Sequence, residues 1–550
     1  MFKHNPADKQ LSLTDPYLSY SQYVQEALLK SWAETFLKTI FVNIDEERFA
    51  LLYSEKASRP NAAVNVLIGL LILKELNNWS DIETIASLYF DYRVQYALGI
   101  TDFEKERICV NTLGNFRSRL YQFNEEEGRD LLAEEIASLN QKIIDFTEMD
   151  TSFLRQDSMM ISSNAKKMGR LELIYTVNAN MVKLFRAHDL SLLPPSFKHY
   201  GQEKDKADHV YRVNKEEVEQ KTLELLKESV ELYNSTPEEL KHTEEFKALE
   251  RLIGEQINQD QTPKKNKEIP ADSLQNPSEP DATYRCKGNK SYNGYVMNLV
   301  EAYDRAKNLS LIVYHELQPN VVSDVELGLN ALEELTEGQT LVSDGAYFSQ
   351  KMVEKAAKKE VNLSFSALSG RSVAEETLGA DQFLIDPETE LILACPGGNV
   401  PLKAERDHEK ETYKARFAKE TCASCPLKER CIIKEQVKSN LVTFTDKQLT
   451  IAIYRTLLGT AEHQALGDFR AGVEGVPSVL RRRYRIDELP VRGLIRSRIW
   501  DNLKIMACNF SSVHRYLQRN RVAALSWLNF LRYLSRLFPK KAAVGVTVGG

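Results

Sequence analysis

The sequence has no long apolar run. The longest, residues 66–73, is far shorter than the roughly 20 residues that a membrane-spanning helix needs. Residues 1–20 contain neither an apolar signal core nor a small-residue cleavage site, so secretion is not expected. These absences predict a soluble protein of the cytoplasm that acts without a membrane partner.

Cysteine is scarce, and neither sign of charge dominates. The seven cysteines among 550 residues are not spaced as a disulfide framework, so a cluster among them indicates a metal site or free thiols. The net charge of −6 argues against a nonspecific binder of polyanions, although a net value hides local patches.

The nine histidines form no convincing Ser/His/Asp or Cys/His arrangement, which fits a reaction without a covalent enzyme intermediate.

The first part of the chain is predicted to be helical. An apolar helix is expected over 61–77, and a Ser-x-x-Glu capping box opens a second helix over 80–96. A third helix carries Arg117 and Arg119. Three short helices with polar breaks favour a helix-turn-helix-like module whose last helix presents these arginines to DNA. A plain helical bundle with a solvated basic face is the alternative.

From residue 143 the pattern changes to strands. Strands are expected at four places, 146–160, 291–301, 310–316 and 340–343, and a helix at 349–359 followed by a strand at 361–365 makes a β-α-β step. The strongly helical segment 223–257 and the Pro-, Asn- and Lys-rich segment 262–282 are expected to form an inserted arm and a mobile loop. At about 100 to 200 residues per domain, the chain has room for three or so domains.

A second predicted insertion, residues 368–442, contains four of the cysteines. The tight pair Cys422 and Cys425 suits one metal ion, Cys431 follows closely, and Cys395 completes a tetrahedral thiolate site. Zinc in such a closed site has a structural role, because it has no open position for chemistry. The alternatives are buried thiols, or a site in which His408 replaces one cysteine.

Three acids in strand and helix contexts suggest a reaction centre. Asp157 and Asp344 lie at predicted strand ends, and Glu474 lies on a late helix. Two acids on strands and a third on a helix form the ligand set of a two-metal phosphoryl-transfer site. Asp150 competes with Asp157 for the first position, and each acid taken alone also suits a turn, a helix cap or a surface ion pair.

Two cations flank the third acid. Arg470 lies four residues before Glu474 and Arg481 seven after it, which places all three on one face of a continuous helix. Pro477 between them is able to break that register. The wider segment 469–498 has eight arginines against three acids, a balance of 8 − 3 = +5, and is expected to meet phosphates. Its basic residues are Arg470, Arg481, Arg482, Arg483, Arg485, Arg492, Arg496 and Arg498.

These motifs resemble those of a known family. Segments 157–164 and 168–173 are similar to the first-acid region of DDE-type bacterial insertion-sequence transposases of the IS eleven-eighty-two group, and segment 343–347 is similar to the second. The similarity covers about residues 61–521. The Arg470, Glu474 and Arg481 trio resembles the Tyr, Arg, Glu, Lys signature of related transposases. Gly467 stands near the position where the signature has Tyr, and Arg481 stands where it has Lys. The DNA contacts that the Tyr and Lys make in related transposases therefore cannot be carried over to this sequence.

The resemblance implies a fold and a domain order. The fold is α/β (α+β), with a helical DNA-binding domain followed by an RNase H-like catalytic core that contains the inserted helical arm and the cysteine-containing insertion. The expected divisions are a polar leader, 1–45; the helical domain, 46–142; the catalytic domain, 143–520, with insertions 195–285 and 368–442; and a C-terminal helix with a disordered tail, 521–550.

The resemblance also implies a reaction. Because a family-like segment, 162–164, follows it, Asp157 is preferred to Asp150; it would bridge two Mg²⁺ or Mn²⁺ ions, with Asp344 and Glu474 each holding one. Water would cleave the transposon end, and the exposed 3′-hydroxyl would then join target DNA. The expected partner is double-stranded DNA bound by a homodimer in the bacterial cytoplasm, at the nucleoid. A nuclease that never joins ends and a domesticated DNA-binding protein are the alternatives.

Two groups of arginines are expected to contact the DNA. Arg117 and Arg119 would do so from the helical domain, and Arg470, Arg481, Arg482, Arg483 and Arg485 beside the reaction centre, where planar guanidinium groups favour bidentate phosphate contacts. Tyr347 and Trp500 are candidates for stacking on an unpaired base. Tyr347 is at least as well explained as a core residue.

Overall fold

The computed structural model describes residues 1–5, 16–54, 56, 60–100, 108–189, 193–202, 204–260, 262–368 and 377–537. The predicted disordered tail lies outside this part of the chain. Among the residues described, no helix is long and apolar enough to cross a membrane.

Short helices form the first part of the chain. They are α1 (Pro16–Ser19), α2 (Gln22–Lys30), α3 (Trp32–Thr39), α4 (Val64–Asn77), α5 (Asp81–Phe90), α6 (Tyr92–Ala97), α7 (Val110–Glu127) and α8 (Leu131–Thr147). The capping box at Ser80 is confirmed, since its hydroxyl accepts from the Glu83 N–H and the Glu83 carboxylate accepts from the Ser80 N–H. The single helix expected over 80–96 is wrong, because Asp91 ends α5 and caps α6.

The segment predicted as a polar leader contains core residues. Phe36 of α3 is fully buried, and its ring meets that of Phe510 edge-on with centroids 5.2 Å apart. Phe510 belongs to the long helix α18 (Leu494–Leu537). Residues far apart in sequence thus share one core, which continues from α3 and α4 through the central sheet.

The central sheet combines antiparallel and parallel strands. Its members are β1 (Phe153–Ser162), β2 (Thr283–Lys287), β3 (Lys290–Asp304), β4 (Leu309–Pro319), β5 (Thr340–Ser343) and β6 (Asn362–Phe365). β3 pairs antiparallel with β1, β2 and β4, whereas β5 pairs parallel with β1 and β6. The expected β-α-β step is confirmed, with α13 (Gln350–Lys358) between β5 and β6. A strand from residue 146 is wrong, since α8 continues to Thr147.

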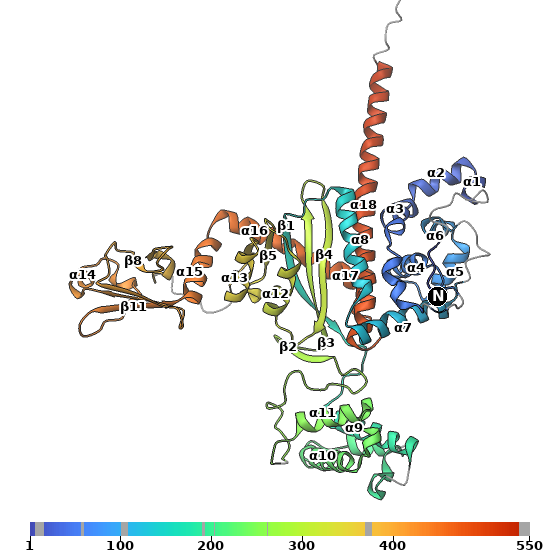
Figure 1. The fold of residues 1–550 in the computed structure, drawn as a ribbon, viewed down its shortest axis with the longest axis horizontal. Coiled ribbons are helices and arrows are strands. Elements are labelled where there is room, and N and C mark those ends of the chain that lie inside the picture. The colour runs from blue at the N-terminus through green and yellow to red at the C-terminus, as the bar shows by residue number, and fades with distance from the viewer. Residues whose placement is uncertain are drawn as a thin grey trace, which may run out of the picture.

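Helices cover both faces of this sheet (Figure 1). On one face α18 packs against β4, where Asn502 Oδ1 accepts a hydrogen bond from the His315 ring at 2.8 Å. On the other face lie α12 (Asp324–Glu334) and α13. Asp324 at the start of α12 accepts from Ser158 of β1 at 2.9 Å.

Two insertions extend away from the sheet in different directions (Figure 1). The helical arm consists of α9 (Arg170–His188), α10 (Val218–Ser235) and α11 (Glu244–Gln256) around a core of its own. The helical segment expected at 223–257 is therefore two helices. The chain turns between them at Pro237, which precedes the short helix η7 (Glu238–Leu240).

The second insertion is a small β-rich unit. Strands β9 (Lys403–Asp407), β10 (Thr412–Phe417) and β11 (Asn440–Thr445) form an antiparallel sheet, and β7 (Leu384–Ile385) pairs with β8 (Ile392–Ala394). Its core is separate from that of the central sheet. Helices α14 (Lys419–Ala423) and α15 (Asp446–Leu458) complete it and return the chain to the sheet.

Candidate active site

Alternation along β1 separates two sets of polar side chains. Successive residues of a strand point to opposite faces. Arg155 and Asp157 face the helices of the last third of the chain, since they contact Phe469 and Arg470. Gln156 and Ser158 face the other way. The Asp157 side chain is 20% exposed, so this carboxylate is partly buried on the face of the sheet.

Asp344 lies beside Asp157 because β1 and β5 are parallel neighbours. The register pairs Leu154 with Leu341 and Arg155 with Val342, and two further steps bring Asp157 next to Asp344. A hydrogen bond of 2.8 Å from the Ser343 hydroxyl to Gln156 Oε1 shows that the register continues this far.

The Asp344 carboxylate caps the turn that follows β5. Its Oδ1 accepts from the Gly345 N–H, and the short helix η8 (Gly345–Tyr347) begins there. A Cβ atom at Gly345 would lie 2.3 Å from the carbonyl oxygen of Ala367, so only glycine permits this close approach of the backbone. The turn after β5 is thereby held against the segment that follows β6.

Arg470 joins Asp157 to Glu474. Helix α16 (Ala461–Ala471) ends in the short helix η11 (Gly472–Glu474), and α17 (Gly475–Tyr484) follows. Arg470 Nη2 lies 3.0 Å from Asp157 Oδ1, and Nη1 lies 3.6 Å from Glu474 Oε1. The predicted pairing of Arg470 with Glu474 is thus present. We call this group the sheet cluster: Asp157, Asp344, Arg470 and Glu474.

Arg155 positions η11 over β1, a role that sequence reasoning missed. Its Nε donates to Glu301 at 2.5 Å, and its Nη1 donates to the Phe469 carbonyl at 3.0 Å. The guanidinium also lies over the rings of Tyr303 and Phe469, 4.8 and 5.3 Å from their centroids. A Cβ atom at Gly472 would lie 2.1 Å from Arg155 Nη1. The sequence did contain a sign of this role: Arg155 lies two residues before Asp157 and therefore on the same face of the strand.

The charge state of Asp157 reflects its surroundings. Burial raises the pKa of its carboxyl group, Asp344 raises it further, and Arg470, the Ser158 N–H and Lys287 oppose the rise. Lys287, at the end of β2, is an exposed cation that sequence reasoning also missed. Two neighbouring carboxylates are suited to a divalent cation, and their hard oxygen atoms suit Mg²⁺ or Mn²⁺. In this structure Arg470 already contacts one of these carboxylate oxygens, Oδ1 of Asp157.

Asp150 and Arg481 lie away from the sheet cluster. Asp150 accepts from the Ser152 N–H in the turn before β1, and its own N–H donates to Asp304. Asp150 lies three residues before β1 begins at Phe153, whereas Asp157 is the fifth residue of that strand. Arg481 pairs with Asp487 at 2.9 Å and donates to the Met160 carbonyl. The expected continuous α-helical face is interrupted, because the helix tightens into a 3-10 turn at Gly472–Glu474, whereas Pro477 lies within α17.

The predicted DNA-contacting arginines divide into exposed and engaged groups. Arg481, Arg482, Arg483 and Arg485 are all exposed at the end of α17, close in sequence to Glu474. Arg117 forms a bidentate ion pair with Asp81, with Nη2 2.5 Å from Oδ2, and its side chain is only 18% exposed. Arg119 is exposed and lies over the Tyr53 ring.

The two aromatic residues considered for base stacking are core residues. Tyr347 is 1% exposed, and its hydroxyl donates to Asn298 Oδ1 at 3.1 Å. Trp500 is 7% exposed, and its ring is covered by the Lys74 ammonium, 3.9 Å from the centroid.

The four cysteines of the second insertion gather in one place. A Cβ atom at Gly397 would lie 3.1 Å from Cys425 Sγ and 3.7 Å from Cys395 Sγ. Burial raises the pKa of Cys431, and the other three thiols of the group raise it further. In the part of the chain that the structure describes, no three of their sulfur atoms lie within 4.8 Å of one another. His408 pairs instead with Glu390, at 3.7 Å.

Comparison with known proteins agrees with these observations. Residues 394–514, which include the cysteines, Glu474 and the exposed arginines, match the family described as transposase DDE domain. Residues 25–119 match the transposase domain DUF772, which covers most of the first helices. No curated protein and no solved structure matches the chain. With transposase families matched in both its N-terminal and its C-terminal region, the protein is identified as a DDE-type insertion-sequence transposase.

Proposed function

We propose that the protein cleaves the ends of its transposon and joins the freed 3′-hydroxyl groups to target DNA, using the sheet cluster as its active site. The observation that carries this proposal is the meeting of Asp157, Asp344 and Arg470–Glu474 from three distant parts of the chain. The DDE match adds support because it contains Glu474. The IS eleven-eighty-two group is the subgroup that the first-acid and second-acid motifs favour.

The proposed core is RNase H-like, residues 143–520 with the two insertions. Its support is the strand pattern: antiparallel pairs around β3, a parallel β1–β5–β6 step, and a late helical segment that carries the third acid. In this arrangement the sheet fixes Asp157 and Asp344, whereas Glu474 depends on Arg155 and Gly472 for its place.

Asp157, Asp344 and Glu474 would hold two Mg²⁺ or Mn²⁺ ions. Such ions, when bound, activate the attacking oxygen and stabilise the leaving oxygen of an in-line displacement. The residues of the chain supply the rest. Asp157, whose pKa is raised by burial, would offer its carboxylate to a cation in the ionised form, and Arg470 would turn from Asp157 toward a phosphate, for which its planar guanidinium is suited.

Double-stranded DNA would lie along α17. Exposed Arg481, Arg482, Arg483 and Arg485 would contact backbone phosphates there, while the helices matched to DUF772 would read the terminal repeats through Arg119. Arg117 would instead support that surface through Asp81. Two ends must be brought together for joining, so we propose a homodimer on DNA, in the bacterial cytoplasm at the nucleoid.

We further propose a structural Zn²⁺ for Cys395, Cys422, Cys425 and Cys431. The support is their convergence on the second insertion, whose own core is small. Small units with few buried apolar residues commonly need a metal or disulfide for stability.

The deciding experiment incubates the full chain with labelled transposon-end DNA and Mg²⁺. Transposition chemistry yields 3′ nicks followed by products joined to target DNA. Nicks without joined products at any target concentration would favour the nuclease alternative, and binding without nicks would favour the domesticated DNA-binding protein. The Asp157→Asn variant serves as the inactive control.

A further inference from the structure

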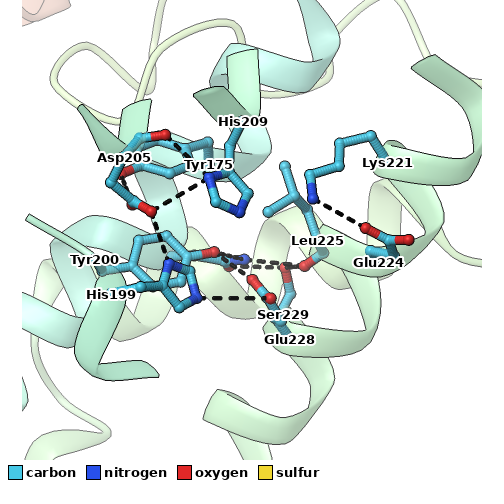
Figure 2. Close-up of polar contacts among 11 residues, drawn as sticks. Tyr175, His199, Tyr200, Asp205, His209, Lys221, Glu224, Leu225, Glu228 and Ser229 are labelled. Atoms are coloured by element: carbon cyan, nitrogen blue, oxygen red, sulfur yellow. Dashed lines mark hydrogen bonds and ion pairs between the residues drawn. The ribbon is translucent and has the colours of Figure 1, made fainter. Parts of the chain in front are cut away.

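The helical arm contains a second cluster of titratable side chains, far from the sheet cluster in the fold. His199 ends the short helix η5 (Pro195–His199), and His209 belongs to the short π-helix η6 (Ala207–Tyr211), with Asp205 just before it. Figure 2 shows these three side chains turned toward one another, with Glu228 of α10 beside them. We call the group the arm cluster: His199, Asp205, His209 and Glu228.

The donor atoms of the arm cluster are spaced as metal ligands are. His199 Nδ1 lies 2.9 Å and His209 Nδ1 lies 3.2 Å from the same oxygen, Asp205 Oδ1. One ligand atom from each of the three residues lies within 4.8 Å of the others. Ligands at about 2.0–2.1 Å from a tetrahedral Zn²⁺ are about 3.3–3.4 Å apart. Only small side-chain shifts would therefore admit an ion.

Other groups hold the ligands in orientation. Tyr175 donates a short hydrogen bond to Asp205 Oδ2, which leaves Oδ1 for the two imidazoles. Burial, followed by Asp205, raises the pKa of Tyr175, so that its hydroxyl remains a donor. His199 Nε2 points to Glu228 Oε1 at 3.9 Å, and Glu228 also accepts from Tyr200. A carboxylate behind the second nitrogen of a histidine is the usual support for a metal-ligating imidazole.

The two imidazole rings stack face to face beside a buried acid. Their interplanar angle is 14° and their centroids are 5.1 Å apart. The Asp205 side chain that both rings approach is only 5% exposed. A buried carboxylate is costly without a compensating positive charge, and a divalent cation held here would supply one.

We propose that the arm binds one Zn²⁺, or a similar borderline divalent transition metal, through His199, Asp205 and His209. Two imidazoles and one carboxylate suit such ions better than Mg²⁺, which prefers oxygen ligands. The metal would fasten η5 and η6 to each other and, through Tyr175 and Glu228, to α9 and α10. This site is independent of the sheet cluster and of the cysteine cluster.

The test uses the full chain with Cys395→Ser, Cys422→Ser, Cys425→Ser and Cys431→Ser, which removes the cysteine cluster. After treatment with a chelator and dialysis, Co²⁺ is added and its visible absorption and stoichiometry are measured. With excess Mg²⁺ present to occupy the sheet cluster, we expect one bound Co²⁺ per chain without a sulfur-to-metal charge-transfer band, displaced by Zn²⁺. His199→Ala combined with His209→Ala should lower the affinity at least about 100-fold, the upper end of the loss seen when even an outer-shell partner is changed.

Two controls keep the test decisive. His188→Ala removes an exposed histidine of the same arm, paired with Glu239, and should leave Co²⁺ binding unchanged. Asp205→Asn keeps the shape of the side chain, so loss of binding with unchanged circular dichroism supports the site even where the double alanine variant misfolds. The absence of Co²⁺ and Zn²⁺ binding in the cysteine variant, or binding that Asp205→Asn leaves intact, would overturn the proposal.

Discussion

The sheet cluster and the arm cluster differ in how the chain assembles them. The sheet cluster joins residues from three distant segments, and the register of parallel strands and one arginine contact decide where its acids lie. Three members of the arm cluster, His199, Asp205 and His209, come from one short segment between α9 and α10, and Glu228 comes from α10 itself. A pleated sheet thus positions distant residues by pairing, whereas the arm relies on local turns and on tyrosine hydrogen bonds.

The chemistry of the two clusters differs in the same way. Oxygen ligands alone, as in the sheet cluster, suit Mg²⁺ or Mn²⁺, which exchange readily and accept phosphate oxygens. The mixed nitrogen and oxygen ligands of the arm cluster suit a tightly held transition metal. We therefore expect metal at the first to control the reaction, and metal at the second to control the stability of the arm.

The largest expected effect separates the two clusters by activity. Asp157→Asn should lower cleavage of transposon-end DNA by at least about 10²–10³-fold, the scale of losing a group that stabilises charge in the transition state. Binding of the DNA should change little, because the acid holds metal and not DNA. The measurement is the nicking rate in Mg²⁺ together with the affinity for end DNA.

Asp150→Asn is the matched control for that experiment. Asp150 caps a turn at the far end of the same strand, so its variant should keep most of the activity. Equal loss in both variants, or activity of Asp157→Asn at roughly a tenth of wild type, would place the first acid elsewhere. Asp205→Asn in the arm should leave the rate constant for nicking unaltered at temperatures where the arm is folded.

Much of the fold could be predicted from the sequence where local signals agree with packing. The predicted bounds of β5 agree with those in the structure, and the predicted capping box at Ser80 is present. The start of β1 was not, because apolar Ile143 and Ile144 suit a strand as well as the buried face of α8. The packing of the polar leader was harder to predict, because Phe36 of its helix α3 meets Phe510 of α18, which is distant in sequence.

The candidate sites were predictable only in part. Asp157, Asp344 and Glu474 could be proposed from their strand and helix contexts, but no sequence pattern showed that Arg481 turns away to Asp487. The 3-10 turn that begins at Gly472 packs against Arg155, 317 residues earlier, whose guanidinium fills the space that a side chain at Gly472 would take. The arm cluster was missed because only Asp205 and His209 have a helical spacing, while His199 lies in another short helix, and Tyr175 and Glu228 come from α9 and α10.

A glycine substitution tests the contact that holds Glu474 over the sheet. Gly472→Ala would place a methyl group on the Arg155 guanidinium, and overpacking of this kind costs about 1–3 kcal/mol in the free energy of unfolding. Gly475→Ala, three residues on, meets no atom within 4 Å and has helical φ and ψ, so it should be neutral or slightly stabilising. The measurement is chemical unfolding of both variants, with nicking rates.

The outcome bears directly on the comparison between the clusters. Gly472→Ala should slow nicking and leave Co²⁺ binding by the arm unchanged. Equal stability of the two glycine variants would show that η11 does not depend on Arg155. Loss of Co²⁺ binding in Gly472→Ala would show that the two clusters are coupled, against the independence that we infer.

A smaller effect concerns pH and the stability of the sheet cluster. Burial, with Asp344, raises the pKa of Asp157 above the ordinary value of about 3.9. The folded state therefore favours the protonated acid, and this contribution to stability is complete below the unfolded pKa and is lost as the pH rises through the folded pKa. Asp157→Asn, which cannot ionise, should be more stable than wild type at neutral pH, by about 1.4 kcal/mol for each unit of the rise.

Thermal unfolding of both proteins at acidic and neutral pH checks the sign of this difference in stability. The difference between Asp157→Asn and wild type should shrink as the pH falls and vanish below about pH 3.9. A variant that is less stable than wild type at neutral pH would mean that the ion pair with Arg470 outweighs the cost of burial. Asp150→Asn again serves as control, with the opposite sign, because hydrogen bonds from Ser152 lower the pKa of Asp150.

The smallest expected effect concerns the salt dependence of DNA binding, which tests whether the DNA lies beside the sheet cluster or along the arm. If Arg482 and Arg483 meet phosphates near the sheet cluster, changing both to Gln should flatten the dependence of log affinity on log salt by up to about 2, since each neutralised phosphate contributes about 0.9. Sequence preference should persist, because phosphate contacts position the DNA without specifying it. Lys265→Gln with Lys267→Gln, an exposed pair on the arm, should leave the slope unchanged. The reverse pattern in salt titrations with end DNA would show that the DNA lies along the arm, and the exposed arginines of α17 would then need another partner.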